Sequence, residues 1–213
     1  MPNYTRTLKR LFKIFLTTVI LLLLIFFGTT VYLKHSASQI LTADKFKQIC
    51  DDIYSSPTLP QHFKDTYTKV YPNAFDDNFN TTFVKSILGK GQEQCPSRQV
   101  ANQCWTLFTG TSSHFMQKLN YAGFVWLLED NVSQEKCFEY FVSRTDFLYN
   151  TKGPEQAAQF YYKKTLSSLT IDEEIGLILK IKNPSFYDNI RFPDRCNKDI
   201  KKLKDKITGH NSG

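Results

Sequence analysis

The chain has 213 residues, of which 41% are hydrophobic and 15% aromatic. This length favours one domain with at most an appendage and excludes a large multidomain enzyme. The apolar and aromatic content excludes a disordered protein, because disordered chains have few such side chains. The formal net charge is +7, but five basic and no acidic residues precede Asp44. The rest of the chain has 22 basic and 20 acidic residues, so we expect no nucleic-acid partner.

An uncharged apolar run covers residues 14–33, between Lys13 and Lys34. About 20 helical residues cross the hydrocarbon core of a bilayer, so we predict a single membrane-spanning helix over this range. The alternative is a cleaved signal peptide, although its apolar stretch typically has only about 7 to 15 residues. Four basic residues precede the run and one follows it closely. By the positive-inside rule, we expect residues 1–13 in the cytoplasm and the chain after Lys34 on the other side of the membrane.

The five cysteines lie at positions 50, 95, 104, 137 and 196. They form no CxxC pair and no cluster with histidine at the spacing of zinc ligands, so we expect no metal and no cofactor. Because five is odd, an oxidising compartment would allow at most two disulfides and leave one thiol. The alternative is that all are buried or incidental thiols.

From Pro60 onward, apolar residues recur at spacings of three and four, which is typical of amphipathic helices. Helix starts are indicated by Ser133 as an N-cap, by Pro154 at a first helical position, and by a capping box of Thr170 and Glu173. We therefore predict an all-α fold. Its expected core includes these residues: Trp126, Phe138, Phe141, Ala157, Ala158, Ile175 and Leu179.

Four segments carry a more specific pattern. Residues 117–129 resemble the motif RKxxEAxxAxxLE, and residues 132–144 resemble LSKxEILExYLNR. Residues 153–164 resemble GIEAAAxxYFGK, and residues 169–196 resemble LxLxEAALLAxLPxAPSxYxPxxNPERA. Through these motifs the chain resembles glycosyltransferase family 51, the peptidoglycan transglycosylase module of bifunctional penicillin-binding proteins and of monofunctional transglycosylases.

Two weaker matches lie upstream, in the order that the family has. Residues 91–105 resemble GGSTITQQLxxNLF, and residues 59–75 resemble the segment that leads into EDxxF. The resemblance implies a lysozyme-like α-helical lobe and a smaller, partly membrane-embedded lobe that grips a lipid-linked substrate. We therefore divide the chain into these parts: cytoplasmic basic tail 1–13, transmembrane helix 14–33, stalk 34–58, transglycosylase-like domain 59–205 and tail 206–213.

The chain departs from the family at the positions that carry the chemistry. In the family, the Glu of EDxxF deprotonates the incoming sugar hydroxyl, and the Glu of RKxxE helps to stabilise the departing pyrophosphate. The register puts Tyr71 on the first Glu and Tyr121 on the second, and we expect the two rings to face one another across the cleft. A tyrosine is protonated at neutral pH because its pKa is about 10, so neither can serve as a resting base. Asp76 or Asp77 could replace the lost carboxylate, although adjacent loop aspartates are usually exposed.

Three residues are candidates for substrate binding by the same resemblance. Lys118 lies where the family uses a cation near phosphate, and the alternative is a solvated lysine on a helix. Gln99 and Ser97 lie on polar positions of the second motif, where they would line a relic groove or cap a helix. Glu139 and Glu155 match the family and are interpreted as structural residues that orient helices.

The resemblance and its departures predict a membrane-anchored, degenerate transglycosylase-like protein, acting as a binding or regulatory pseudoenzyme in cell-envelope assembly. We expect it in the inner membrane of a bacterium, with the domain periplasmic or otherwise extracytoplasmic. The expected partners are the lipid bilayer, lipid II or a polyprenyl pyrophosphate, and other cell-envelope proteins. Two alternatives remain open: a divergent active glycosyltransferase that polymerises lipid II or another polyprenyl-linked glycan, and a structural membrane protein without a ligand.

Overall fold

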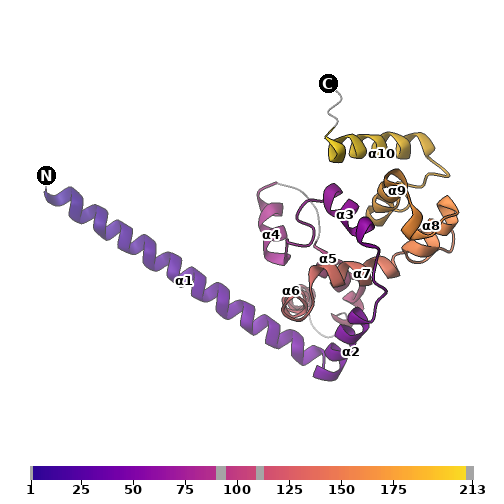
Figure 1. The fold of residues 1–213 in the computed structure, drawn as a ribbon. Coiled ribbons are helices and arrows are strands. Elements are labelled where there is room, and N and C mark those ends of the chain that lie inside the picture. The colour runs from indigo at the N-terminus through magenta and orange to yellow at the C-terminus, as the bar shows by residue number, and fades with distance from the viewer. Residues whose placement is uncertain (1, 90–94, 109–112, 210–213) are drawn as a thin grey trace.

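The computed structural model describes residues 2–89, 95–108 and 113–209, and these residues form α-helices and short 3-10 helices without any strand. The all-α class predicted from the sequence is confirmed. Figure 1 shows a compact helical domain from which the first helix projects. The helices are α1 Pro2–Ile40, α2 Ala43–Tyr54, α3 Gln61–Val70, α4 Phe79–Ile87, α5 Pro96–Gln103, α6 His114–Asn131, α7 Gln134–Arg144, α8 Pro154–Tyr162, α9 Ile171–Lys182 and α10 Pro193–Thr208.

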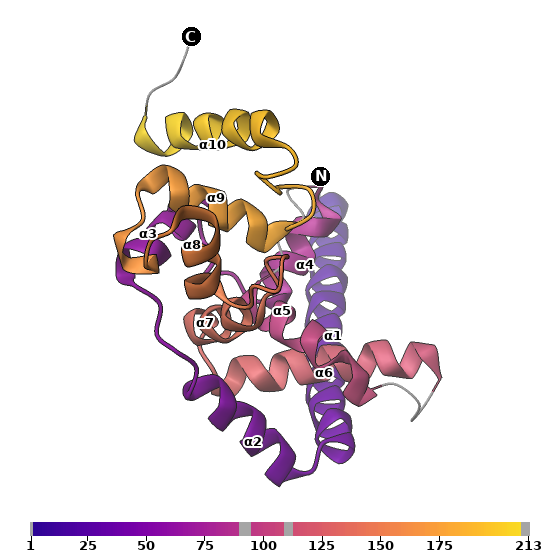
Figure 2. The same ribbon diagram turned by 90° about the vertical axis from the view of Figure 1, so that its right-hand side faces the viewer.

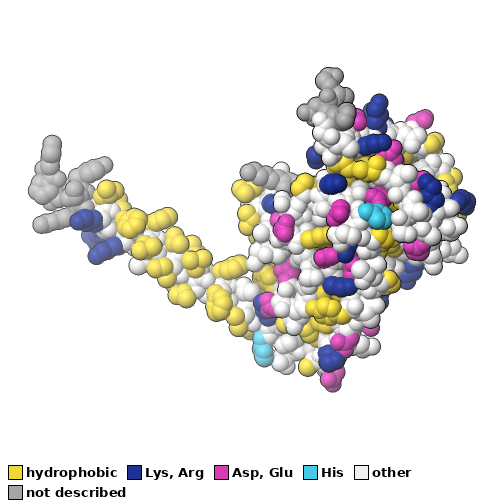
Figure 3. Space-filling view, in the orientation of Figure 1, with side chains coloured by type: hydrophobic (Ala, Val, Ile, Leu, Met, Phe, Trp, Pro, Cys, Tyr) yellow, Lys and Arg dark blue, Asp and Glu magenta, His cyan; other side chains and the backbone are white. Residues whose placement is uncertain are grey.

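Helix α1 contains the apolar run and continues without a break into the domain. Its stretch Thr7–Ile40 is long and apolar enough to cross a membrane, and the most apolar window of that stretch is not buried. Figure 3 shows hydrophobic side chains along the projecting part, with Lys and Arg near its free end. These features support a membrane anchor, because an apolar surface of this length is unfavourable in water.

The last turns of α1 pack tightly on α6. A methyl group at Gly123 would overlap the backbone carbonyl of Leu33, so only glycine allows the two helices to approach this closely. Ser36 Oγ donates a hydrogen bond to Asn120 Oδ1 at 2.7 Å, and Lys34 pairs with Asp130. Thus the segment 34–58, which comprises the end of α1 and all of α2, packs against α6 and α7.

The main core lies between α3, α7, α8 and α9. The predicted N-cap is present, since Ser133 accepts a hydrogen bond from the Lys136 amide. The capping box is present as well, with the Thr170 amide 2.8 Å from Glu173 Oε2. Most of the expected core residues are buried, namely Phe138, Ala157, Ala158, Ile175 and Leu179.

Trp126 and Phe141 are half-buried; Phe141 packs against the main core as expected, whereas Trp126 is not part of it. The indole N–H of Trp126 donates to Asn80 Oδ1 at 2.8 Å, and its ring packs edge-on against Phe79 and Phe26. Trp126 therefore lies near the surface between α4 and the membrane helix. Periodicity within one helix could not distinguish this position from a core position.

Two further amphipathic helices, α10 and α4, lie on the outside of the domain. In the two views α10 lies beside α9, at the end of the domain opposite α2 (Figures 1 and 2). Its apolar residues Ile200, Leu203 and Ile207 pack against the main core. Helix α4 lies on the side of the domain that faces the projecting part of α1 (Figure 1). Its outer face is apolar, with Phe83 55%, Val84 52% and Ile87 70% exposed.

Candidate functional site

A cleft of about 490 Å³ opens between α3, α4, α5, α7 and α9. Its floor is aromatic: the Tyr67 ring lies 4.1 Å from that of Phe138 and 5.2 Å from that of Tyr71, measured between centroids. The rest of the lining is mixed, with polar side chains such as Thr82, Gln99 and Lys182 beside the apolar Ile178 and Ile181. A cavity of this size, with an apolar floor and a few polar groups, is typical of a ligand site.

Tyr71 is the residue that ends α3, where its amide donates to the Tyr67 carbonyl at 2.8 Å. The side chain is half-buried and lines the cleft. Tyr71 therefore brings a phenol into the cleft. It leaves the cleft open instead of filling it.

Tyr121 is held away from this cleft, in the contact between α5 and α6. Its hydroxyl donates to Asn102 Oδ1 at 2.7 Å and to the Arg98 carbonyl at 3.2 Å, and its ring packs against Trp105. Burial raises the pKa of Tyr121 above its ordinary value, so its hydroxyl is protonated at neutral pH and holds no free site for a proton. Tyr121 is not among the residues that line the cleft, so the expected opposition of Tyr71 and Tyr121 across it is not seen.

Asp76 and Asp77, the two aspartates of the loop after α3, differ in position. Asp77 lines the cleft with its side chain 18% exposed, and it forms an ion pair with Lys85. Asp76 is exposed and is not among the lining residues. The loop after α3 therefore brings one carboxylate into the cleft.

The three binding candidates are not brought together. Gln99 lines the cleft, whereas Ser97 is fully buried and Lys118 is exposed on α6 outside the cleft lining. Ser97 and Gln99 lie two positions apart on one helix and therefore point in different directions. Only Gln99 is in a position to contact a ligand in this cleft.

Sequence reasoning missed a buried hydrogen-bond network behind the cleft. Glu129 Oε1 accepts hydrogen bonds from Ser97 Oγ at 2.7 Å, from the Phe79 amide at 2.8 Å and from Gln134 Nε2 at 2.9 Å. One carboxylate thus ties together the starts of α4, α5 and α7, which form the cleft walls. In the sequence, Glu129 stands out only as the last Glu of the motif RKxxEAxxAxxLE. This match does not show which groups its carboxylate contacts.

A second buried network positions α3. Lys64 is buried and pairs with Glu135 and Glu139, while Glu139 also accepts from Lys136 and from the Leu59 amide. These donors hold the pKa of Glu139 below its usual value despite its burial. Glu139 therefore orients α3 against α7, in line with the structural role expected of it.

The five cysteines are all unpaired thiols in this structure. Cys95 lines the cleft, and burial raises its pKa, so the group is present as a neutral thiol at pH 7. Within the described ranges, no group of three or more His, Cys, Asp and Glu side chains could hold a metal ion.

Comparison with known proteins identifies the class of molecule that this fold and cleft define. The family model described as Transglycosylase matches residues 85–208, more than half of the chain. The chain therefore belongs to the transglycosylase family.

Individual relatives agree with this assignment. The chain is 33% identical over 95 residues to a biosynthetic peptidoglycan transglycosylase of Methylobacillus flagellatus, covering 45% of the chain and 40% of that relative. It is 30% identical over 95 residues to a protein of the same name in Acinetobacter baumannii (strain SDF), covering 45% and 41%. A third, from Paraburkholderia phytofirmans, is 27% identical over 85 residues, covering 40% and 35%. The matched segment thus spans about two fifths of each relative or less.

Proposed function

We propose that this protein is a degenerate peptidoglycan transglycosylase that binds a lipid-linked glycan or its diphosphate without polymerising it, in a binding or regulatory role in cell-envelope assembly. The proposal rests on the two positions at which the resemblance has glutamates, because both hold a tyrosine in this chain. Tyr71 is a phenol in the cleft, and Tyr121 is hydrogen-bonded away from it with a raised pKa. A positioned general base typically contributes a factor of about 100 to 10,000 in rate, which a protonated phenol does not supply.

Cations near Tyr121 support binding of an anionic group. The Arg98 carbonyl accepts from Tyr121, and the buried Nε of Arg98 has no hydrogen-bond partner among the described residues. Lys118 lies three positions before Tyr121 on α6, and therefore on a neighbouring part of the same helix surface. A diphosphate oxygen is the kind of acceptor with which Arg and Lys form charge-assisted hydrogen bonds.

The position of the exposed apolar surfaces supports the proposal of a lipid-linked ligand. The apolar α1 and the exposed apolar face of α4 lie on the same side of the domain (Figure 1). A ligand carried by a polyprenyl chain in the bilayer would approach from that side. We accordingly propose an inner-membrane protein of a bacterium, with an extracytoplasmic domain over residues 59–205.

Glycan synthesis from lipid II by the purified full-length protein tests the proposal. We expect no polymer from the unmodified protein. A variant carrying Tyr71→Glu and Tyr121→Glu is compared with it, because it restores both carboxylates. Polymer formed by the unmodified protein at the rate of an active transglycosylase would contradict the proposal.

A second candidate function is favoured by Asp77, the carboxylate that lines the cleft beside Tyr71. In a divergent active glycosyltransferase, Asp77 would be the general base that deprotonates the acceptor hydroxyl. The same assay separates the two functions. If polymer forms, Asp77→Asn should lower the rate by about 100 to 10,000-fold, while Asp76→Asn serves as the matched control and leaves it unchanged.

A further inference from the structure

An exposed apolar patch lies on the connection between α9 and α10. It consists of Phe186, Ile190 and Phe192, which are 44%, 57% and 40% exposed, and we call these three residues the loop patch. Figure 1 shows this connection on the side of the domain away from the projecting part of α1, so a bilayer crossed by α1 would not cover the patch. None of the three residues lines the cleft. Apolar side chains that cluster on a surface mark interaction sites, whereas isolated ones are common everywhere.

The connection that carries the loop patch is held in place by hydrogen bonds. Asp188 is fully buried, and its carboxylate accepts from the Ile190 amide at 3.0 Å and from the Tyr149 hydroxyl at 2.5 Å. The Phe192 amide donates to the Asp188 carbonyl at 2.8 Å. A surface that is already ordered loses little conformational entropy when a partner binds. The loop patch is therefore preorganised.

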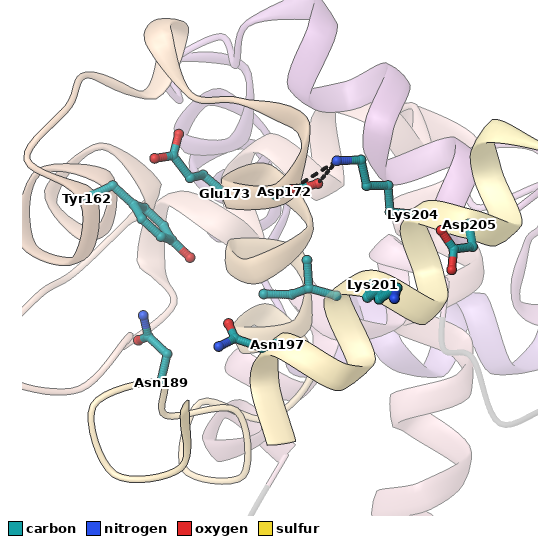
Figure 4. Close-up of a pocket in the computed structure, with 9 residues that line it drawn as sticks. Tyr162, Asp172, Glu173, Asn189, Asn197, Lys201, Lys204 and Asp205 are labelled. Atoms are coloured by element: carbon teal, nitrogen blue, oxygen red, sulfur yellow. Dashed lines mark hydrogen bonds and ion pairs between the residues drawn. The ribbon is translucent and has the colours of Figure 1, made fainter. Parts of the chain in front are cut away.

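Helix α10 is fixed on α9 behind this connection. A groove of about 570 Å³ lies between the two helices, and Asn189 points into it toward Tyr162 (Figure 4). Beside the groove, Lys204 Nζ of α10 lies 2.9 Å from Asp172 Oδ1 of α9. The connection is therefore anchored at both of its ends, with Asn189 on its inner side and the loop patch exposed to solvent.

Two arginines flank the loop patch. The Arg195 guanidinium lies 4.4 Å from the centre of the Phe186 ring and 4.5 Å from that of Phe192, so it joins the two rings into one surface. Arg191 and Arg195 are exposed, and neither forms an ion pair with another described residue. Residues 183–198 have three exposed basic side chains and one exposed acidic side chain. The rim of the patch is therefore positive. Arginine and aromatic side chains are also the types that are enriched at protein interfaces.

We propose that the loop patch binds a short acidic segment of a partner protein. An aliphatic side chain of that segment packs on the rings of Phe186 and Phe192, and its carboxylates pair with Arg191 and Arg195. A guanidinium group suits this role because it can pair with a carboxylate through two hydrogen bonds.

The size and charge of the loop patch favour this occupant over a second copy of the chain. A two-fold contact would bring the same positive rim together from both copies, which is unfavourable. Three exposed side chains are also too small a surface for a stable interface between whole domains. The patch is separate from the cleft, so this inference does not rest on the proposed function.

Binding of a short fluorescein-labelled peptide, in which a central pair of leucines lies between glutamates, tests the loop patch. Fluorescence anisotropy measures its affinity for the full-length protein in non-ionic detergent micelles. We expect saturable binding that Ile190→Ser weakens by about tenfold, because it removes an apolar contact. We expect Arg191→Gln to weaken it by about threefold at low salt and by less at high salt. Lys45→Gln, which removes an exposed positive charge on α2 at the other end of the domain, is the matched control and should leave the affinity unchanged.

Four outcomes would overturn the proposal. The first three are absence of saturable binding, equal affinity for a peptide with lysines in place of the glutamates, and an affinity that neither Ile190→Ser nor Arg191→Gln changes. The fourth is self-association of the unmodified protein in sedimentation experiments that Ile190→Ser abolishes, which would assign the loop patch to a second copy. None of these measurements involves lipid II, so the test fails or succeeds independently of the proposed function.

Discussion

At the scale of single residues, the contacts and the protonation state of a side chain depend on the groups that surround it. Tyr71 lines an open cleft, whereas Tyr121 is hydrogen-bonded between two helices. Lys64 and Lys180 are both buried lysines, but only Lys64 has carboxylate partners within ion-pair distance among the described residues. Such differences in burial and in charged partners decide whether a side chain is ionised at a given pH, and therefore whether it can donate or accept a proton.

Lys118 is the residue to test for an inherited phosphate contact. If the protein binds a lipid II analogue, Lys118→Ala should weaken that binding by about 1.5 to 3 kcal/mol, the usual value for a hydrogen bond to a charged group. Lys198→Ala, another exposed lysine, on α10, is the control and should leave the affinity unchanged. Equal affinities of the Lys118→Ala variant and the unmodified protein would refute the phosphate role.

Lys180 provides a prediction on pH. Its ammonium group lies 4.5 Å from the centre of the Tyr161 ring, and burial lowers its pKa from 10.5 to about 8, with Cys196 and Asp188 opposing the shift. Between pH 8 and 10.5 the unfolded chain binds more protons at this group than the folded chain does. The contribution of Lys180 to the free energy of unfolding therefore rises with pH across this window, and its cost is greatest below pH 8.

Replacing Lys180 by Met should remove this cost. We expect Lys180→Met to raise the free energy of unfolding by up to about 3 kcal/mol at pH 7, and by progressively less as the pH approaches 10.5. Denaturant unfolding of the variant and of the unmodified protein at several pH values measures the difference between their free energies of unfolding. The titration of tyrosines and cysteines, which both proteins share, largely cancels in this difference. An increase in the free energy of unfolding that stays constant from neutral to alkaline pH would contradict the lowered pKa of Lys180.

At the scale of helices, the contact between α1 and α6 determines how the domain is attached to its apolar helix. Leu33, Ala37 and Leu41 are buried at this contact, and Gly123 allows the backbones to meet. Close approach at a small residue is a common way to pack helices in and near membranes. The attachment is therefore a packed junction, which fixes the direction of α1 relative to the cleft.

Gly123→Ala tests this junction. The added methyl group would overlap the Leu33 carbonyl, and we expect destabilisation by about 1 to 3 kcal/mol, the usual cost of overpacking. Thermal unfolding of the detergent-solubilised protein measures it. Gly28→Ala is the matched control, because nothing lies within 4 Å of a methyl group built on Gly28 of α1. Equal melting temperatures for the two variants would show that the helices do not pack as described.

At the scale of the whole molecule, charge and apolar surface together suggest an orientation in the bilayer. Four basic residues precede the apolar run and one follows it closely. The exposed apolar face of α4 lies on the side of α1. A domain seated on the extracytoplasmic surface of the membrane would satisfy both features.

A reporter fused after Gly213 tests the orientation. We expect a reporter that is active only outside the cytoplasm to give signal, because the basic N-terminus should stay in the cytoplasm. The matched fusion carries a reporter that is active only in the cytoplasm. Signal from that second fusion with silence from the first would reverse the predicted topology.

The sequence by itself determined the features that depend on neighbours along the chain. The apolar run, the Ser133 cap and the capping box at Thr170 were all predictable, since each follows from hydrogen bonds or packing within a few residues. The all-α class follows from the same local periodicity. Motif spacing also indicated the family, because matching positions of glycine, proline and capping residues do not follow from helical periodicity alone.

Only the tertiary structure decided which side chains share a site. Gln99 lines the cleft and Ser97 does not, Asp77 lines it and Asp76 does not, and Tyr121 is turned to α5. The groove at Tyr162 likewise depends on Gly176 and on residues of α10. The physical reason is that a helical sequence specifies its own hydrogen bonds, whereas the direction of each side chain relative to a cleft depends on how helices distant in sequence pack together.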